Sequence, residues 1–367
     1  MSRIRPIVMP RWGMEMTEGI IAAWLAAPGS MVAEGDEIVE IETTKITNVY
    51  ESPVAGTLRR LVAKTGETVP CGRLIAVLAD ADIGEAEIDD FLAAAATESA
   101  VPEASTVNVP LRSSVLLDGL QIGVVSMGAG PATPVLFVHG FGADWTTWMF
   151  NLPSIAAGRR CHAIELPGHG ASGKQIAQAD VPSLARLLGA YIDTLAVPRC
   201  HVVGHSLGAA GALALAMTAP DKVASLTLIA PGGLGRDVNA EFVRGFVEAG
   251  TRREMKAVLS LLVNDADLVT RRMIDDVMVY KRTDGVAEAL GVYLRDCFPG
   301  FEQAWVAAQA PAALAMPVQI IAGDGDQIVR LPPGTRPAAH VIAGAGHLVH
   351  MEKSNEVNRL IEALVGR

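Results

Sequence analysis

The chain has 367 residues, of which 50% are hydrophobic and 19% charged, enough apolar material for one large domain and a small one. Its net charge of −10 and its pI of about 5.3 exclude the basic surface typical of nucleic-acid-binding proteins. Scattered cysteines without a C-x-x-C motif, no signal-peptide pattern and only short apolar runs predict a reduced, cytoplasmic protein that does not enter membranes.

The N-terminal segment contains an internal repeat with an offset of 37 residues. The stretch GSMVAEGDEI at 29–38 matches GETVPCGRLI at 66–75, with glycines and aliphatic residues at equivalent positions. Two copies are too few for a solenoid, but they suit a small sandwich of two similar β halves. Two runs of alternating apolar residues meet at Lys45, with no glycine or proline beside it. We therefore expect Lys45 on the central hairpin of an all-β sandwich.

The sequence VMPRWGMEMTEGIIAAWLAAPGSMVAEGDEIVEIETTKITNVYESPVAGTL resembles a lipoyl domain, and we assign residues 1–79 to it. The resemblance implies that a lipoate ligase attaches lipoate to Lys45 in amide linkage. The family usually has Asp before this lysine, whereas here the residue is Thr44. Biotinyl domains share the fold but flank the lysine with methionines, so Thr44 and Ile46 argue against biotin. Taken without its context, Lys45 would be an ordinary solvated lysine.

Residues 80–106 have a different composition, rich in Ala, Glu and Asp. Ile88, Phe91 and Leu92 fall at helical spacing, which is compatible with a short helix, and the remainder is typical of a flexible tether. We predict a flexible linker, with a docking helix for a partner enzyme as the alternative. The subunit-binding module and the H-x-x-x-D-G motif of multienzyme acyltransferases do not occur in the chain, so the C-terminal part must use other chemistry.

A second domain is expected over 107–367, and its central motif is G-H-S-L-G at 204–208. An apolar, strand-like run precedes the motif and a helical run of small residues follows it, which is the context of a nucleophile elbow. Such a turn holds the serine, here Ser206, in a strained backbone conformation. Gly204 and Gly208 permit this turn because they have no side chains to clash. The motif predicts a nucleophilic serine.

An acid and a base follow Ser206 in chain order. The stretch PVQIIAGDGDQIV at 317–329 reads as a strand followed by two acids, and a later loop carries His347. The order Ser, Asp, His resembles that of α/β-hydrolases, as do PVLFVHGFG at 134–142 and ELPGHGASG at 165–173. We expect a doubly wound, mostly parallel sheet. Residues 234–305 lack strong strand patterns and predict a helical cap.

The predicted catalytic residues have three different roles in acyl transfer. Ser206 is a poor nucleophile unless a base takes its proton, and His347 is the base. A carboxylate orients the imidazole and stabilises its charged form. The family pattern places this acid three residues after the glycine that ends the strand, which favours Asp326 over Asp324. The sequence therefore excludes neither aspartate as the acid that orients His347, but it favours Asp326.

The oxyanion hole is expected at two backbone N–H groups. One belongs to Leu207, which follows the nucleophile, and the other to Phe141, which follows the His-Gly pair. Among the histidines, we expect His139 to brace a loop, His205 to be structural and His350 to line the site. No cluster of histidines and acids has metal-ligand spacing, so we predict no metal site.

A lipoyl domain joined to an α/β-hydrolase domain resembles the dihydrolipoamide acetyltransferase component of bacterial acetoin dehydrogenase (acetoin-cleaving) systems. The resemblance covers the whole chain. It implies that a thiamine-diphosphate-dependent acetoin dehydrogenase component loads acetyl onto the lipoyl arm, that the acetyl group passes to coenzyme A, and that dihydrolipoamide dehydrogenase reoxidises the dithiol. We expect a homo-oligomer. Two alternatives stay open, namely an esterase or thioesterase that uses water, and a non-catalytic carrier with a degenerate hydrolase body.

Overall fold

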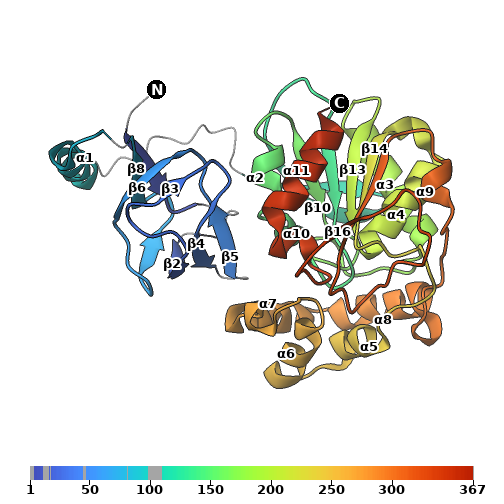
Figure 1. The fold of residues 1–367 in the computed structure, drawn as a ribbon. Coiled ribbons are helices and arrows are strands. Elements are labelled where there is room, and N and C mark those ends of the chain that lie inside the picture. Colours follow the sequence, from blue (N-terminus) through green and yellow to red (C-terminus); the bar gives the residue numbers. More distant parts are fainter. Residues whose placement is uncertain are drawn as a thin grey trace. The chain divides into compact units, whose positions relative to one another are not determined.

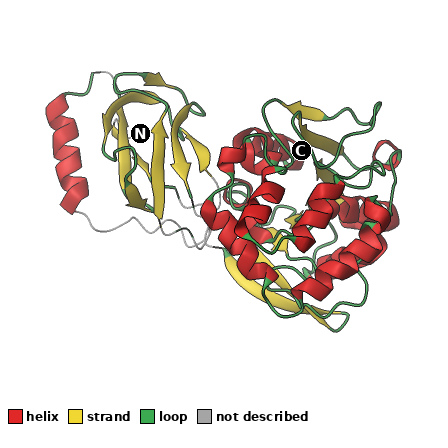
Figure 2. Cartoon of the chain, turned by 90° about the horizontal axis from the view of Figure 1, so that it is seen from below, coloured by secondary structure: helices red, strands yellow, loops and turns green. Residues whose placement is uncertain are grey.

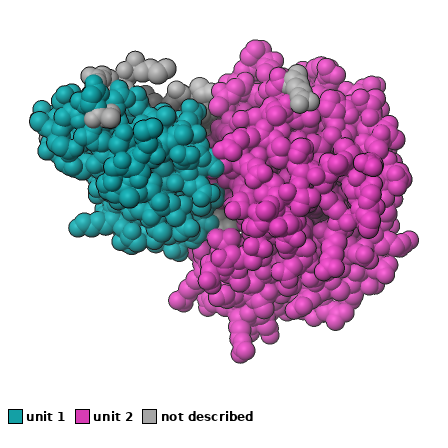
Figure 3. Space-filling view, viewed as in Figure 1, with its two compact units in different colours: residues 1–106 teal, residues 107–367 magenta. Residues whose placement is uncertain are grey.

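The computed structural model describes most of the chain, namely residues 4–10, 16, 18–43, 47–80, 82–97 and 110–366. The chain divides into two compact units, Met1–Thr106 and Val107–Arg367 (Figure 3). Each unit has its own cluster of buried apolar side chains. Within the described ranges, no helix combines the length and the apolar character that crossing a bilayer requires.

The first unit is a β sandwich (Figure 1). Its two four-stranded sheets have the strand orders β1-β8-β6-β3 and β5-β4-β2-β7. Its strands are β1 Ile4–Val8, β2 Glu18–Trp24, β3 Met31–Val32, β4 Glu37–Glu42, β5 Thr47–Glu51, β6 Gly56–Leu61, β7 Thr68–Pro70 and β8 Leu74–Ala79. The internal repeat is visible in the backbone, because Gly29 and its counterpart Gly66 have φ values of 93° and 84°. Glycine adopts this left-handed conformation at little cost. The predicted β sandwich is confirmed.

Helix α1, Glu85–Thr97, follows the last strand of this sandwich. Its Ile88 is fully buried in a cluster that includes Val77 of β8, and this apolar contact is the main attachment of the helix. Arg59 of β6 adds an ion pair with Glu85 at 2.5 Å, but such half-exposed pairs contribute little. The first turns of α1 therefore pack onto the sandwich. The helix agrees with the helical spacing of Ile88, Phe91 and Leu92, whereas a flexible linker was the main expectation for this segment.

The second unit is built on an eight-stranded sheet of order β16-β15-β14-β13-β11-β12-β10-β9. Neighbours from β16 to β12 are parallel, whereas β10 is antiparallel to both β12 and β9. The strands are β9 Leu111–Leu117, β10 Leu120–Met127, β11 Val135–Val138, β12 Cys161–Ile164, β13 Cys200–His205, β14 Val223–Ile229, β15 Val318–Gly323 and β16 His340–Ile342. This confirms the predicted mostly parallel sheet.

Helices cover both faces of this sheet, with α3 and α4 on one face and α2, α10 and α11 on the other (Figures 1 and 2). Their bounds are α2 Leu152–Ile155, α3 Val181–Thr194, α4 Leu207–Thr218, α10 Val349–Glu352 and α11 Ser354–Val365. The central strands are buried along their whole length because both faces are covered. Short helices lie in the connections, namely η2 Trp145–Trp148, η3 Pro220–Lys222, η4 Ala266–Leu268, η5 Pro299–Phe301 and α9 Ala310–Ala313.

Four amphipathic helices are inserted between β14 and β15, a stretch that the structure describes in full. They are α5 Ala240–Glu248, α6 Arg252–Ser260, α7 Arg271–Lys281 and α8 Val286–Cys297. We call residues 234–305 the cap. Side chains cap three of the four N-termini, including a capping box of Thr251 and Glu254 before α6. The inserted helices confirm the predicted helical cap.

Candidate active site

Ser206 lies at the junction between β13 and α4, with φ 54° and ψ −119°. This conformation is costly for a residue with a side chain, so the surrounding turn must impose it. A Cβ atom on Gly204 would lie 2.6 Å from the Cα of Ala209, and one on Gly208 would lie 2.4 Å from the carbonyl oxygen of His139. Both glycines of the motif are therefore required for the sharp turn that presents Ser206 at the carboxyl end of the strand.

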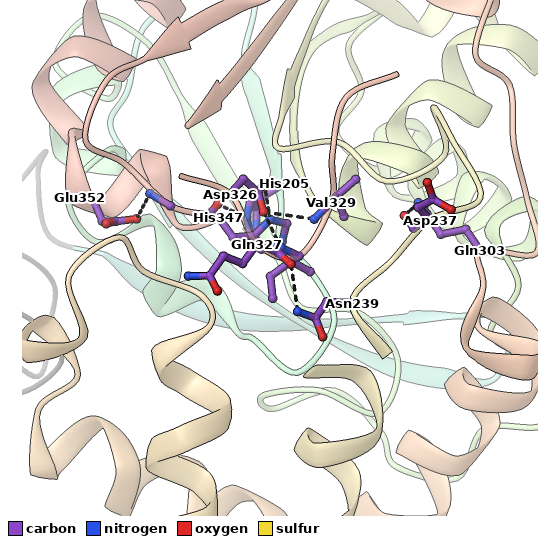
Figure 4. Close-up of polar contacts among 11 residues, drawn as sticks. His205, Asp237, Asn239, Gln303, Asp326, Gln327, Val329, His347 and Glu352 are labelled. Carbon is purple, nitrogen blue, oxygen red and sulfur yellow. Dashed lines mark hydrogen bonds and ion pairs between the residues drawn. The ribbon is translucent and has the colours of Figure 1, made fainter. Parts of the chain in front are cut away.

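His347 and Asp326 form a buried pair, in which the imidazole Nδ1 donates to the carboxylate Oδ2 at 2.8 Å (Figure 4). Their side chains are only 2% and 5% exposed. The other carboxylate oxygen of Asp326 accepts the N–H groups of Ile328 and Val329 at 2.8 and 3.1 Å. Since Nδ1 carries the proton, Nε2 of a neutral His347 has a free lone pair and can act as a base.

The Asp326 carboxylate is stabilised in its ionised form. Burial by itself would raise the pKa of Asp326. The charge of His347, its hydrogen bond and the two backbone N–H groups outweigh burial, and the pKa lies below its usual value. A fixed negative charge beside an imidazole supports the positive charge that the ring acquires when it takes a proton.

Asp324, the other acid left open by the sequence, lies apart from this pair. Its side chain is exposed, and Oδ1 accepts the N–H of Gly344 at 2.8 Å, which braces the loop after β16. The structure therefore pairs His347 with Asp326. Ser206 is the remaining member of the predicted set, and among the described residues its hydroxyl makes no hydrogen bond to His347.

The loop after β11 lies directly against Ser206. A Cβ atom on Gly140 would be 2.9 Å from the Cβ of Ser206. Leu207 is the first residue of α4, so its N–H is one of the groups that a helix start leaves unpaired. The N–H of Gly142 is already donated to Nε2 of His169 at 3.0 Å, whereas that of Phe141 has no acceptor within the described part of the chain. Phe141 and Leu207 thus keep the N–H groups that an oxyanion hole needs.

Two buried histidines hold this loop in place. His139 accepts the N–H of Leu166 at 3.0 Å through Nε2 and donates Nδ1–H to the carbonyl of Gly140 at 2.8 Å. Burial lowers the pKa of His139 to about 4, and burial together with the charge of His139 lowers that of His169 to about 3. Both rings are therefore neutral near pH 7. No role for His169 could be predicted from the sequence, although its place in ELPGHGASG marked a feature of the fold.

His350 does not line the site as the sequence suggested. It is fully buried behind His205, with the two ring centroids 4.4 Å apart, and its Nε2 hydrogen-bonds the hydroxyl of Thr147 at 2.7 Å. The expectation was wrong because His350 lies in the short helix α10, which turns the side chain toward the core. His205 is structural as expected, since its Nε2 contacts the carbonyl of His347.

Each of the two units matches a known protein family. The family model for the alpha/beta hydrolase fold matches residues 133–354, and the model described as "Biotin-requiring enzyme" matches 5–78. A curated relative from Cupriavidus necator is 40% identical, covering 99% of this chain and 98% of the relative. It is the dihydrolipoyllysine-residue acetyltransferase component of an acetoin cleaving system, and a relative of the same name from Pseudomonas putida is 37% identical. The chain belongs to this family.

The second unit of this acetyltransferase-family chain is also similar to solved hydrolases. One is the meta-cleavage product hydrolase from Pseudomonas fluorescens IP01, which is 21% identical with a TM-score of 0.62. The match covers 69% of this chain and 97% of the hydrolase. At this identity the likeness establishes the fold alone, so the reaction must be argued from the site.

The β4–β5 hairpin is where this acetyltransferase family would carry its lipoyl group. The two strands are antiparallel with Glu42 opposite Thr47, so residues 43–46 connect them. Lys45, the predicted attachment site, lies in this connection and outside the described residues. It provides the one primary amine in the connecting sequence TTKI, which is the group that an amide linkage to lipoate requires. The residues of the β4–β5 connection therefore fit a covalently attached lipoyl group.

Proposed function

We propose that the chain is an acetyltransferase that moves acetyl from a lipoyl-lysine thioester to coenzyme A in acetoin catabolism. The observation that carries the proposal is the buried hydrogen bond from His347 to the ionised Asp326 carboxylate, on the same chain as a lipoyl-type hairpin. Residues 1–79 form the lipoyl domain with Lys45 as its attachment site. Residues 107–367 form the catalytic domain.

The first half-reaction places acetyl on Ser206. The lipoyl group, when attached, supplies a thioester as the acyl donor. The Ser206 hydroxyl attacks the thioester carbon while Nε2 of His347 takes its proton, and the Asp326 carboxylate stabilises the imidazolium. The backbone N–H groups of Phe141 and Leu207 hold the oxyanion. The C–S bond then breaks, and His347 returns the proton to the departing thiolate.

The second half-reaction returns the enzyme to its starting state. His347 takes the proton of the coenzyme A thiol, and the sulfur attacks the acetyl carbon on Ser206. The same N–H groups hold the second oxyanion. The C–O bond to Ser206 breaks, and its oxygen regains the proton from His347. Passing acetyl from one thiol to another changes the free energy little, so energy alone does not favour coenzyme A over water. The site must therefore favour the thiol by positioning it.

Membership of the family supports a set of partners for this chain. We infer that a thiamine-diphosphate-dependent acetoin dehydrogenase component loads the lipoyl arm and that dihydrolipoamide dehydrogenase reoxidises it. A lipoate ligase modifies Lys45. We also propose that the chain acts in the cytoplasm, as a homo-oligomer within this multienzyme complex, as the family resemblance implies.

The experiment separates transferase from hydrolase. Purified protein receives acetyl-dihydrolipoamide with and without coenzyme A, and acetyl-coenzyme A and acetate are measured separately. Coenzyme A should divert most of the flux to acetyl-coenzyme A. If acetate dominates at saturating coenzyme A, the chain is a thioesterase. If neither product forms, the second unit is a carrier without catalytic function.

A further inference from the structure

The cap is hydrogen-bonded to the loop that carries the catalytic acid. Asn239 precedes α5, the first helix of the cap. Its backbone N–H donates to the carbonyl of Ile328 at 2.9 Å, and its side-chain amide donates to the carbonyl of Gln327 at 3.0 Å (Figure 4). Both acceptors directly follow Asp326. The entry to the cap therefore helps to fix the loop that orients His347.

The cap is also fastened to the loop that carries the base. Glu352 accepts the N–H of Gly346, next to His347, through one oxygen and the N–H of Asn264 in the cap through the other, both at 2.8 Å. The carbonyl of Leu262 in the cap accepts the N–H of Leu348 at 3.0 Å. The residues on either side of His347 are thus tied to the cap. A shift of the cap would move the backbone of the base.

The third attachment is the side chain of Phe141, whose N–H is assigned to the oxyanion hole. Phe141 is 7% exposed, and its ring packs on three rings of the cap. The centroid distances are 5.6 Å to Phe246, 6.0 Å to Tyr293 and 5.5 Å to Phe298. The next residue, Gly142, has φ +75°, and a Cβ atom there would be 2.5 Å from the ring of Phe246. The cap therefore sets the path of the oxyanion loop.

Two cap tyrosines reach the histidine that braces this loop. Tyr280 donates its hydroxyl to the carbonyl of Gly168 at 3.1 Å, and Tyr293 donates to that of Pro167 at 2.9 Å. Both rings pack on His169, with centroids 6.2 and 4.9 Å away. His169 in turn accepts the N–H of Gly142. The tyrosines are thus positioned to hold the oxyanion loop through His169.

We propose that the cap is part of the catalytic apparatus, so that the oxyanion donor of Phe141 and the base His347 are in place only while the cap is seated. Tyr280, Tyr293 and Glu352 are positioning residues in this scheme. The inference rests on the proposed function, in which acetyl-Ser206 must be protected from water. Attack by water needs the same base and the same oxyanion donors as attack by the thiol. A cap movement that admits water would also dismantle the groups that water requires.

A cap that only seals the site predicts the opposite behaviour. Loosening such a seal would expose an intact catalytic site to water, and acetate formation would rise while acetyl-coenzyme A formation fell. Under our proposal, loosening the cap lowers both products together. The ratio of acetate to acetyl-coenzyme A therefore separates the two schemes. Thermal unfolding of each variant shows whether a parallel fall of both products comes instead from a loss of folded protein.

The test uses the full-length, lipoylated protein and a double variant, Tyr280→Phe with Tyr293→Phe, which removes two hydroxyls and leaves the rings. Tyr191→Phe is the matched control, because it removes a buried hydroxyl that contacts His162 and belongs to α3, outside the cap. Acetyl-dihydrolipoamide and coenzyme A are the substrates, and thermal unfolding of each variant is recorded. Glu352→Gln tests the second attachment, with Glu362→Gln as its control on α11, where it contacts Ser154.

The double variant and Glu352→Gln should each lower kcat for acetyl-coenzyme A at least about tenfold, less than the roughly 10²–10³ lost when an oxyanion donor is removed outright, because these changes displace the donor and leave it present. KM should change little, acetate formation should fall in parallel, and the two controls should keep wild-type rates. Acetate formation above the wild-type rate, or unchanged kcat in both variants, would overturn the proposal. Hydrolysis of p-nitrophenyl acetate should fall in the same variants. That assay needs Ser206, His347 and the oxyanion hole but no lipoyl donor or coenzyme A, so it tests the inference even if the wild type proves to be a thioesterase.

Discussion

His205 contacts the main-chain carbonyl of His347 through Nε2 at 3.0 Å, and the two rings lie 4.7 Å apart. A carbonyl only accepts hydrogen bonds, so Nε2 of His205 must carry the proton. Burial, followed by the charges of His350 and His347, holds the pKa of His205 well below its usual range, and the ring is neutral. The residue before the nucleophile therefore fixes the backbone of the base.

We expect His205→Leu to lower kcat about tenfold, because an unpaired buried carbonyl costs about 1–3 kcal/mol and would let the His347 backbone shift. His205→Gln should recover most of the activity, since the glutamine amide can donate from nearly the same position. Steady-state kinetics with acetyl-dihydrolipoamide and coenzyme A would measure this. His201→Leu, at the other end of β13, serves as the control. Equal activities of the Leu and Gln variants at position 205 would show that the hydrogen bond has no catalytic role.

Ser206→Ala should abolish acyl transfer while leaving lipoylation unchanged, because the nucleophile and the attachment lysine belong to separate units. Loss of the nucleophile in such a site commonly costs about 10⁶ in turnover. Product formation is followed together with intact mass, which reports the lipoyl adduct. A loss of less than about tenfold would assign the nucleophile to another residue.

Lys45→Arg should prevent lipoylation and abolish transfer from the protein's own arm. Arginine keeps the positive charge but cannot form the amide with lipoate. The measurement is the intact mass of protein made in a host with an active ligase, where the wild type should carry one adduct. Transfer from free acetyl-dihydrolipoamide should persist in this variant. An adduct that remains on the Arg variant would place the attachment elsewhere.

Asp326→Asn should lower kcat on the order of 10⁴, by analogy with other Ser-His-Asp sites. The amide cannot stabilise the imidazolium, and its NH₂ group favours the wrong tautomer of His347. Asp324→Asn should have a far smaller effect, because Asp324 is exposed and accepts the N–H of Gly344 instead of contacting His347. Comparing kcat of the two variants decides between the acids, and a larger loss for Asp324→Asn would reverse the assignment.

The second unit should lose stability as the pH falls from about 6.5 towards 4, whereas the first unit contains no histidine and should change less. Burial depresses the pKa of several histidines below their unfolded value of 6.5, namely His139, His162 and His201 to about 4 and His169 and His350 to about 3. In this window the unfolded chain binds more protons than the folded one, so protonation favours unfolding.

Calorimetry at about pH 7 and about pH 5 would resolve the two units. Burial raises the pKa of Glu165 and Glu352, and these two carboxyls oppose the histidine effect. Because more histidines have a lowered pKa than carboxyls have a raised one, the net effect should still be a loss of stability at lower pH. A midpoint of the second unit that does not move between the two pH values would contradict this balance.

Local sequence signals were sufficient for much of the fold and the site. Gly204 and Gly208 predicted the sharp turn at Ser206 because no other residue fits beside the chain there. The repeat predicted the sandwich, since glycines that need positive φ recur at the same offset. The spacing after Gly323 favoured Asp326, which is the acid that the structure pairs with His347.

Contacts between distant segments were beyond the reach of the sequence. His169 looked like part of a loop motif, and its bond to Gly142 depends on how two loops separated by 27 residues meet. His350 follows His347 by three residues, yet it points into the core because α10 begins between them. Helix α1 has the composition of a linker, and only the apolar surface of β8 gives Ile88 a place to be buried.

The packing of α1 matters for anyone who wishes to excise the first unit as a portable lipoylation tag. A fragment that stops at residue 79 would strip Ile88 from Val77 and leave Arg59 without Glu85. The exposed apolar strip along β8 would then favour self-association of the fragment. A fragment that extends to Thr97 keeps this strip covered. The useful cutting point is therefore set by where α1 ends, some eighteen residues beyond the last strand.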